Sequence, residues 1–273
     1  MQRRILEIKD ISKSFALGYK AREGRYSDGH KNVIDGLTMD VNRNEVTALV
    51  GGNGAGKTSL FNLISGLLKP DRGRVLFYGN DKALDCTHAR PWEAARAGIG
   101  RMFQGIRVFG QLSIMDHLLI QACTPASALP FHHFLMPHKH KTLKRRTREK
   151  IMDQLGCYSE VSAMLAEPAR PVSSLSYAQQ RLLSLAGLMV GKYSLLLLDE
   201  PASGFSPESF DTLYGMMEGM RQQGRSIFLI EHNMLFIKKV ASCCHFMSAG
   251  KILFSGSPAE VLDYDEVKKS YLL

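Results

Sequence analysis

A glycine-rich segment in the first quarter of the sequence has residue types and a spacing suited to holding phosphate. Residues 46–60 read VTALVGGNGAGKTSL, an apolar run followed by glycines and then by the start of a predicted helix. Gly51, Gly56, Lys57 and Thr58 have the spacing of a phosphate-binding P-loop. Glycines let successive backbone N–H groups point at phosphate oxygens, and the helix N-terminus adds partial positive charge. We therefore predict that this chain binds a nucleoside triphosphate.

The polar residues that end this segment have distinct expected roles. Lys57 reaches the β- and γ-phosphates, and Thr58 places its hydroxyl on a magnesium ion. A glycine-rich turn with no ligand is the alternative, but the full motif between a strand and a helix disfavours it. The residues predicted here to contact the nucleotide are Gly51, Asn53, Gly54, Ala55, Gly56, Lys57, Thr58 and Ser59.

Two carboxylates follow a run of four leucines later in the chain. Residues 195–198 have the composition of a strand buried on both faces in a parallel sheet, and Asp199 and Glu200 come directly after it. Without a cation, carboxylates at the end of such a strand would be stranded in a low-dielectric setting. We therefore predict that they lie against a cation held at the triphosphate.

Polar residues also end two other predicted strands. Residues 98–104 read GIGRMFQ, which indicates a strand that ends at Gln104. Residues 226–230 read SIFLI, a second buried strand, and Glu231, His232 and Asn233 follow it. His232 could have a purely structural role, as a histidine that ends a strand and hydrogen-bonds to nearby residues.

One aromatic ring precedes a polar loop near the N-terminus. Residues 18–31 are rich in glycine, charge and tyrosine, which predicts an exposed loop. Phe15 stands just ahead of it, where its ring could stack on a flat base. The alternative is that Phe15 caps the small sheet, in which case Tyr19 and Tyr26 are the substitutes for stacking.

Charge is distributed unevenly along the 273 residues. The chain has 35 basic and 26 acidic residues, a net charge of +9, and the segment 139–150 has seven Lys or Arg and one Glu. Such a patch could favour anionic lipid or nucleic acid, but a solvated helix face is the commoner explanation. The length allows one large α/β domain, or a core with a subdomain, that buries a substantial apolar interior.

Cysteine and histidine usage argues against a disulfide scaffold and a dedicated metal site. The five cysteines form no CxxC pair and their number is odd, which fits reduced thiols in a cytosolic setting: Cys86, Cys123, Cys157, Cys243 and Cys244. A cluster of four histidines lacks Cys or carboxylate companions, which disfavours metal binding: His132, His133, His138 and His140. Apolar stretches at 118–131 and 184–198 are short or broken, so we expect no membrane span.

Strand-like and helix-like segments alternate along the chain, which implies a doubly wound α/β core. The other predicted strands are residues 5–11, 33–41, 45–50 and 74–78, with an antiparallel pair at 245–247 and 251–254 that turns at Ala249 and Gly250. The predicted helices are residues 59–68, 91–97, 182–190, 210–223 and 234–241, a helical stretch over 114–165 broken near 125–137, and a terminal helix from 258 onward. Ser174 and Ser176 are candidate N-caps.

The order of these features resembles one family, the nucleotide-binding subunits of ABC transporters. The P-loop, Gln104, the LSYAQQR stretch, the LLLLDE strand and His232 occur in that family's order and at its approximate spacings. The resemblance covers nearly the whole chain. It implies a P-loop NTPase core with a mostly parallel sheet, an N-terminal antiparallel β subdomain and an inserted α-helical subdomain. We expect one ABC ATPase domain over 1–273, with the core and β subdomain at 1–104 and 173–273 and the helical subdomain at 105–172.

The resemblance also assigns roles within the P-loop half of the site. It implies that ATP and Mg2+ are bound, with Thr58, Gln104 and Asp199 around the magnesium. Glu200 would be the general base that polarises the attacking water. His232 would contact the γ-phosphate and stabilise charge as the bond breaks.

A second set of roles falls on the LSYAQQR stretch. Ser176, with Ala178 and Gln179 beside it, would contact the γ-phosphate held by a facing subunit, so catalysis would need a dimer. ATP between two subunits favours a closed pair, and loss of the γ-phosphate releases it. The Gln104 segment joins the core to the helical subdomain, so the resemblance makes it the relay to a membrane-spanning partner.

Three details are similar to the ATP-binding subunit of branched-chain amino-acid importers: the RMFQGIRVF stretch, the tyrosine in LSYAQQR and the ending DEVKKSYLL. The implied partners are permease subunits and a second ATP-binding subunit, identical or different, and a substrate-binding protein is a further candidate. We expect no nucleic-acid partner. The implied location is peripheral, on the cytoplasmic face of the inner membrane.

The chain also departs from the family's pattern. Tyr177 and Ala178 stand where two glycines usually follow the serine, and Ser206 stands where many relatives have Asp or Asn. If position 178 needs a positive φ or a very close approach to phosphate, the Cβ of Ala178 costs about 1 kcal/mol. The departures suggest a weakened composite site in an asymmetric pair. Gly52 replaces the usual proline, a change expected to be harmless.

Rival functions remain open. One is a nucleotide-gated subunit that binds ATP but scarcely hydrolyses it, and another is a transporter of a different cargo such as urea, another amide or a lipid. A soluble ABC ATPase of translation or DNA repair is disfavoured, because such proteins generally carry two cassettes or a long coiled-coil insertion.

Overall fold

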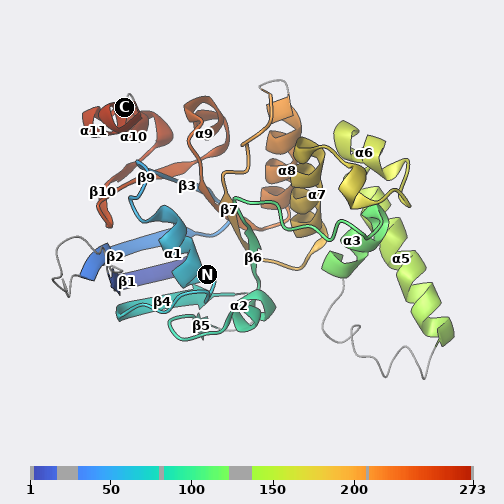
Figure 1. Cartoon of the computed structure of the whole chain (residues 1–273), viewed down its shortest axis with the longest axis horizontal. Helices are drawn as coiled ribbons and strands as arrows, with labels where there is room; N and C mark the ends of the chain where they lie inside the picture. The colour runs from blue at the N-terminus through green and yellow to red at the C-terminus, as the bar shows by residue number, and fades with distance from the viewer. Residues whose placement is uncertain (1–2, 17–29, 80–82, 123–136, 207–208, 272–273) are drawn as a thin grey trace, which may run out of the picture.

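The structure is a computed structural model that describes residues 3–16, 30–79, 83–122, 137–206 and 209–271. Within these ranges the chain forms two sheets and a group of helices, and the antiparallel sheet lies at the opposite side of the molecule from helices α3, α5 and α6 (Figure 1). No helix in the described ranges has both the length and the apolar character needed to cross a bilayer.

The first sheet is antiparallel and carries the N-terminal strand. Its order is β2 (His30–Asn42), β1 (Arg4–Ala16), β4 (Arg72–Tyr78) and β5 (Ala83–Asp85). Ile5, Leu6, Ile8 and Ile11 of β1 are buried, at 1% exposure or less, as expected for the apolar residues of the predicted strand. Burial does not alternate strictly, because Glu7 between them is also buried. The strand runs further than the predicted 5–11, because its pairing with β2 continues to the pair Ala16 and His30.

The second sheet is mostly parallel and carries the predicted site residues at the ends of its strands. Its order is β10 (Lys251–Gly256), β9 (Cys243–Ser248), β3 (Val46–Val50), β8 (Ser226–Ile230), β7 (Leu195–Asp199) and β6 (Ile99–Met102). Strand β10 is antiparallel to β9, and the other five are parallel. Their carboxyl ends therefore meet at one edge, where open α/β sheets bind their ligands.

The helices follow the strands as the periodicity predicted. They are α1 (Lys57–Ile64), α2 (Pro91–Ala97), α3 (Ile114–Ala122), α5 (Pro137–Leu155), α6 (Ser159–Leu165), α7 (Tyr177–Val190), α8 (Phe210–Gln222), α9 (Met234–Val240), α10 (Pro258–Asp263) and α11 (Asp265–Tyr271). The α/β fold with an antiparallel sheet, a mostly parallel sheet and added helices is confirmed.

Two apolar cores hold the layers together. One contains α1 and residues from both sheets, and Phe61 of α1 contacts Phe228 of β8 edge to face at a centroid distance of 5.0 Å. The other joins the opposite face of the parallel sheet to α7 and α8 and continues into α3, α5 and α6. Helix α7 is thus packed both against the sheet and against the helical region.

The basic segment lies on α5 and is exposed along its described side chains. Lys144 pairs with Asp116 of α3 at 3.1 Å, and Arg145 lies 3.6 Å from Glu149. Further along, Ile151 is buried and anchors the helix. This arrangement favours the interpretation of a solvated helix face. Residues 123–136 lie outside the described residues, as do the side chains of 137–141, so the four histidines are untested.

Several predicted boundaries were wrong. Helix α1 begins at Lys57 and ends at Ile64, because Gly66 takes a left-handed conformation with φ 74°. Strand β6 ends at Met102, two residues before Gln104. The terminal helix from 258 onward is two helices separated at Tyr264, which has an extended backbone. The hairpin turn at Ala249 and Gly250 is confirmed, with φ of 45° and 80°.

Candidate active site

The P-loop between β3 and α1 needs glycine at two positions for steric reasons. Gly51 has φ 156°, and a Cβ there would lie 2.1 Å from the carbonyl oxygen of Met247. Gly56 has φ 105°, is the N-cap of α1, and a Cβ there would lie 2.5 Å from the carbonyl oxygen of Val33. The loop is therefore pressed against neighbouring backbone and cannot carry side chains at these two positions.

Lys57 lies inside this loop rather than in solvent. Its side chain is buried, and its Nζ donates to the carbonyl oxygens of Gly51 at 2.7 Å and Gly52 at 3.0 Å. Burial lowers the pKa of Lys57, while Glu200 and Asp199 act in the opposite direction. The ammonium group is held at the mouth of the loop. Its N–H donors, which are suited to phosphate oxygens, are bonded here to backbone carbonyl oxygens.

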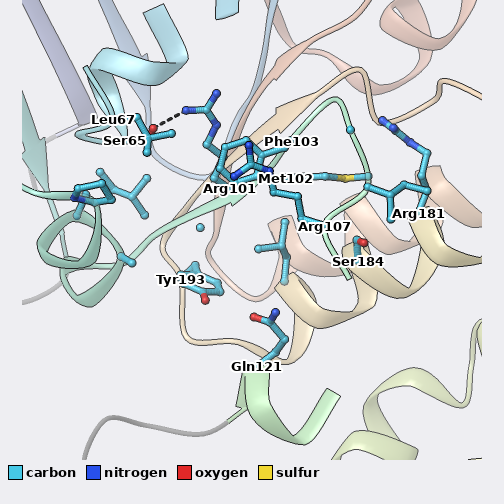
Figure 2. Close-up of a pocket in the computed structure, with 18 of the residues that line it drawn as sticks. Ser65, Leu67, Arg101, Met102, Phe103, Arg107, Gln121, Arg181, Ser184 and Tyr193 are labelled. Atoms are coloured by element: carbon cyan, nitrogen blue, oxygen red, sulfur yellow. Dashed lines mark hydrogen bonds between the residues drawn. The ribbon is translucent and has the colours of Figure 1, made fainter. Parts of the chain in front are cut away.

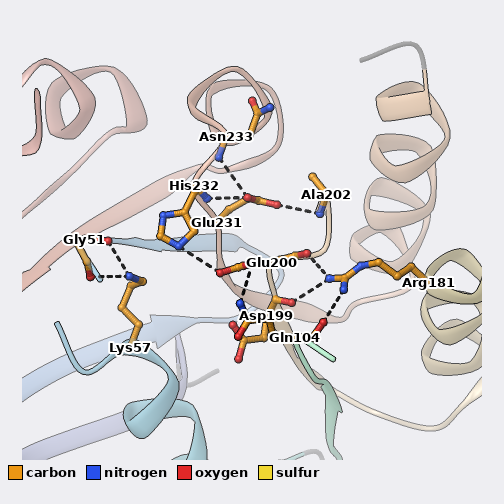
Figure 3. Close-up of polar contacts among 11 residues, drawn as sticks. Gly51, Lys57, Gln104, Arg181, Asp199, Glu200, Ala202, Glu231, His232 and Asn233 are labelled. Atoms are coloured by element: carbon orange, nitrogen blue, oxygen red, sulfur yellow. Dashed lines mark hydrogen bonds and ion pairs between the residues drawn. The ribbon is translucent and has the colours of Figure 1, made fainter. Parts of the chain in front are cut away.

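Glu200 follows β7 in a strained backbone conformation. Its φ is 50°, in the left-handed region, and its backbone N–H donates to Ile230 at 2.8 Å. The carboxylate accepts a hydrogen bond from Gln104 Nε2 at 3.2 Å and lies 3.3 Å from His232 Nε2 (Figure 3). The structure thus brings together side chains that follow β6, β7 and β8.

Asp199 is the adjacent carboxylate, and it is almost completely buried at 2% exposure. Burial raises its pKa to about 6, while Arg101 acts in the opposite direction. The described residues contain no group of three or more His, Cys, Asp and Glu side chains that could hold a metal ion on their own. Thr58, Gln104 and Asp199 nevertheless line one hollow of about 360 Å³. A single protein carboxylate with a hydroxyl and an amide fits Mg2+, which keeps waters and takes substrate phosphates as its other ligands.

A cleft of about 330 Å³ joins the P-loop to these strand-end residues. Lys57, Gln104, Glu200 and His232 all line it. The other lining residues are Lys31, Val33, Asn53, Gly54, Ala55, Gly56, Thr58, Ser59 and Ile230. A phosphate-binding loop therefore faces a carboxylate, a histidine and an amide across one cleft.

Comparison with known protein families agrees with this geometry. The family model described as ABC transporter matches residues 34–203, more than half of the chain. The chain belongs to the ABC transporter family. It is the ATP-binding and ATP-hydrolysing domain of that family.

Two curated relatives have different cargoes in their names. The chain is 28% identical over 240 residues to the high-affinity branched-chain amino acid transport ATP-binding protein LivG of Escherichia coli (strain K12), covering 88% of this chain and 91% of LivG. It is 27% identical over 268 residues to the lipopolysaccharide export system ATP-binding protein LptB of Haemophilus influenzae, covering 98% and 97%. The similarity of the two values leaves the cargo of this ABC transporter subunit undecided.

A solved structure has the same fold over its whole length. The crystal structure of the ADP conformation of an ATP-binding cassette of an ABC transporter matches with a TM-score of 0.76 and 25% sequence identity, covering 99% of each chain. The match extends beyond the residues of the family model to both ends of this ABC ATPase.

The LSYAQQR stretch, residues 175–181, is the segment that we call the signature of this ABC ATPase. It lies at the start of α7, and its serine is outside the described lining of the cleft. Ser176 is the N-cap: its hydroxyl accepts from the backbone N–H of Gln179 at 3.3 Å, and the Gln179 side chain accepts from the N–H of Ser176 at 3.0 Å. Ser176 is thus confirmed as a helix cap, whereas Ser174 lies in the 3-10 turn Val172–Ser174. The described residues that line the cleft do not include Ser176, Ala178 or Gln179. Their contact with nucleotide remains a prediction.

Ala178 does not have the strained backbone that its departure from the family's glycine suggested. It lies within α7, and it is absent from the described non-glycine residues with positive φ. Of the two conditions under which the Cβ of Ala178 would be costly, a positive φ is not met, because residue 178 lies in a right-handed helix that needs no glycine there. Close approach of the Cβ to a phosphate held by a facing subunit stays a prediction.

Phe15, the predicted base-stacking residue, lies on β1 and is 39% exposed. The Lys13 ammonium lies 5.7 Å from the centroid of its ring. Phe15 is not among the described residues that line the cleft. Tyr19 and Tyr26 lie outside the described residues, so base stacking stays a prediction.

Two buried charged residues near the site had no role in the sequence interpretation. Glu231 is 3% exposed and accepts from the backbone N–H of Ala202 at 2.8 Å and of His232 at 2.6 Å, which fixes the chain around His232 (Figure 3). Arg181 reaches the same edge of the sheet from α7 (Figure 3). The position of Glu231 after a buried strand was a usable signal, but the backbone carbonyls that Arg181 contacts lie 18 to 77 positions away in the sequence.

A separate hollow of about 270 Å³ lies beside β6, the segment that follows it, and helices α3 and α7 (Figure 2). Arg101 and Arg107 place their guanidinium groups 4.6 Å and 3.9 Å from the centroid of the Phe103 ring. Burial lowers the pKa of Arg101 to about 10. His117 is 2% exposed, and its Nδ1 has no hydrogen-bond partner among the described residues. We name this hollow the Arg101 groove.

Proposed function

We propose that this chain powers an ABC importer for branched-chain or other hydrophobic amino acids, as a peripheral subunit on the cytoplasmic face of the inner membrane. The observation that carries the catalytic part is the convergence of Lys57, Gln104, Glu200 and His232 on one cleft. The similarity to LivG, a branched-chain amino acid transport protein by name, and the stretch DEVKKSYLL support an amino-acid cargo. LptB supports lipid export as the second candidate.

The first step of the mechanism is capture of the triphosphate. The Lys57 ammonium exchanges the carbonyl oxygens of Gly51 and Gly52 for phosphate oxygens, which restores its hydrogen bonds while bringing opposite charge to a buried cation. The loop N–H groups and the N-terminus of α1 face the same oxygens. Thr58, Gln104 and Asp199 would hold Mg2+, which neutralises charge on the phosphates.

The second step is activation of water by Glu200. As its carboxylate accepts the water's proton, the water oxygen bonds to the γ-phosphorus and the bond from that phosphorus to the ADP oxygen breaks, which releases ADP and phosphate. Gln104 and His232 hold the carboxylate in place from two sides. His232 then donates toward the γ-phosphate as negative charge develops on it. The left-handed backbone at Glu200 aims this carboxylate into the cleft rather than along the sheet.

The remaining contact must come from another subunit. Ser176 caps α7 and is not among the described residues that line the cleft of its own chain, so we propose that it contacts nucleotide across a dimer. We further propose that the Arg101 groove, which adjoins the Gln104 segment, relays closure to the permease subunits. A substrate-binding protein would complete the importer.

The complex that carries this chain tests both halves of the proposal. A tag on the full-length chain should retrieve permease subunits, and the purified complex should hydrolyse Mg-ATP and take up leucine in vesicles. Lys57→Ala should abolish both activities, because the buried ammonium is lost. Retrieval of a lipid-export apparatus would overturn the proposed amino-acid cargo but not the proposed ATPase activity. Full activity of the Lys57→Ala complex would overturn the proposed nucleotide site.

A further inference from the structure

Arg181 is a cation buried deep in the core beside the active site. It is 1% exposed and is the largest of the fully buried side chains among the described residues. It makes no ion pair with a carboxylate in the described part of the chain. A buried guanidinium is costly unless its N–H groups find acceptors.

Three of the four acceptors that Arg181 contacts among the described residues are backbone carbonyls at the catalytic edge of the sheet (Figure 3). Nη1 donates to the carbonyl oxygen of Gln104 at 2.7 Å, and Nη2 donates to those of Asp199, at 3.2 Å, and Glu200. One rigid, planar group therefore ties the segment after β6 to the end of β7. Both segments carry side chains that meet in the cleft.

The Glu200 carbonyl matters because of the conformation of its residue. A glutamate keeps a costly φ of 50° only when contacts from its neighbours hold its backbone in that conformation. Its N–H is held by Ile230 at 2.8 Å, and its carbonyl accepts from Arg181 and from the N–H of Ser203 at 3.1 Å. Arg181 thus fixes one end of the strained residue, and Gln104, whose side chain contacts the Glu200 carboxylate, is fixed by the same guanidinium.

Tyr177 extends this arrangement to the start of α7. Its hydroxyl accepts from Arg181 Nη1 at 3.2 Å, and its ring centroid lies 5.8 Å from the guanidinium carbon. A Cβ built on Gly204, in the loop after Glu200, would lie 2.9 Å from the tyrosine ring, so the ring packs directly on that loop. The residue that replaces the family's first signature glycine therefore contacts both Arg181 and the catalytic loop.

We propose that Arg181 is a positioning residue that sets the Glu200 carboxylate and the Gln104 amide in one geometry and ties both to α7. The inference rests on the proposed role of Glu200 as general base. Because α7 begins at the serine that faces the second subunit, movement of α7 reaches Glu200 through this guanidinium. Arg181 itself is not among the described residues that line the cleft.

The Arg181→Lys variant keeps the charge and loses the planar fork, so it cannot bond Gln104 and Glu200 together. In the purified complex we expect kcat for ATP to fall by about tenfold or more, since small misplacement of a catalytic group has effects of this size. We expect the KM for ATP to stay within about twofold of its original value, because the P-loop is untouched. Equal loss in kcat and in nucleotide affinity would indicate general destabilisation and overturn the proposal.

Arg225→Lys is the matched control. Arg225 is partly buried, and burial lowers its pKa. Its Nη1 donates to the backbone carbonyl of Leu188, on the helix α7 that also carries Arg181, at 2.9 Å. It stands just before β8, at the end of the sheet away from the catalytic edge. The control should lower the unfolding temperature as Arg181→Lys does and leave kcat unchanged. A matching fall in kcat in both variants would overturn the proposal.

A double variant separates this proposal from the proposed function. If Arg181 acts through Glu200, adding Arg181→Lys to Glu200→Gln should lower the residual rate little further, because the base being positioned is already absent. If the double variant instead lost rate by the product of the two single-variant factors, the positioning role would be overturned. A Glu200→Gln variant with full activity would instead overturn the proposed function, whatever the effect of Arg181→Lys.

Discussion

The P-loop half and the signature half of the proposed site differ in how completely one chain builds them. Around the P-loop, Lys57 and Glu200 lie in one cleft with hydrogen bonds already made inside it. At the start of α7, the Ser176 hydroxyl is used by its own helix, and the described lining of the cleft does not include it. The contrast supports the proposal that the single chain binds nucleotide, whereas turnover depends on a second chain.

The largest expected effect falls on the P-loop half. Glu200→Gln keeps the shape of the side chain and removes the base, so we expect kcat to fall by about 100-fold or more while ATP binding persists. Steady-state hydrolysis and equilibrium ATP binding by the same preparation measure the two quantities. A variant that loses binding together with turnover would show that Glu200 holds nucleotide rather than activating water.

The signature half should show a smaller effect that appears in the assembled complex. Ser176→Ala removes a hydroxyl donor to charged phosphate, which is worth about 1.5–3 kcal/mol and so about tenfold or more in turnover. Loss of the cap should also destabilise the chain by about 1 kcal/mol. Ser174→Ala is the control, because Ser174 bonds Pro171 and Arg170 locally. Equal turnover losses in both variants would contradict the assignment of Ser176.

Ala178→Gly sharpens the comparison from the other direction. The helical backbone at this residue carries no strain that glycine could relieve, so the turnover rate should remain within about twofold and stability should fall by up to about 1 kcal/mol. ATPase assays of the complex and denaturant unfolding of the chain give the two values. A marked gain in rate would support the hypothesis of a weakened composite site. Its cause would then be close approach of the Ala178 Cβ to phosphate rather than backbone strain.

The smallest effect concerns the strand that carries Phe15. Hydrogen bonds from Lys13 and Ser14 lower the pKa of Asp71 to about 2, so its stabilising contribution is present above about pH 4 and is lost as the pH falls through about 2. Asp71→Asn should cost about 0.5–1 kcal/mol at pH 7, since the pair is partly exposed. Denaturant unfolding across this range checks it, and a difference that grows toward low pH would contradict it.

The edge of the sheet could be predicted from the sequence because each strand is a short apolar run that ends in polar residues. The placement of Asp199 at the end of β7, of Glu200 just after it and of His232 after β8 followed from that pattern together with the P-loop. Their mutual contacts did not, because Gln104 and Glu200 are 96 positions apart and meet through the strand order of the folded sheet. The family resemblance placed these residues in one site in advance but did not give their contacts.

Other features required the backbone itself. The positive φ that would have made Ala178 costly is not present, and the positive φ of Glu200 was not anticipated, because nothing in the residue type reveals it at a glutamate. Arg181 was visible in the sequence as the last residue of LSYAQQR. Apart from the Tyr177 hydroxyl, its partners are carbonyl oxygens, which every residue carries, so side-chain patterns gave no sign of them.

Equilibrium binding of Mg-ATP to the full-length chain, without its partners, tests the central contrast most directly. The original chain and the Ser176→Ala variant should bind ATP with the same affinity, in the millimolar range or tighter, and Lys57→Ala should bind none. The account would be contradicted if Lys57→Ala bound ATP as the original chain does, or if Ser176→Ala lost binding to the same extent as Lys57→Ala.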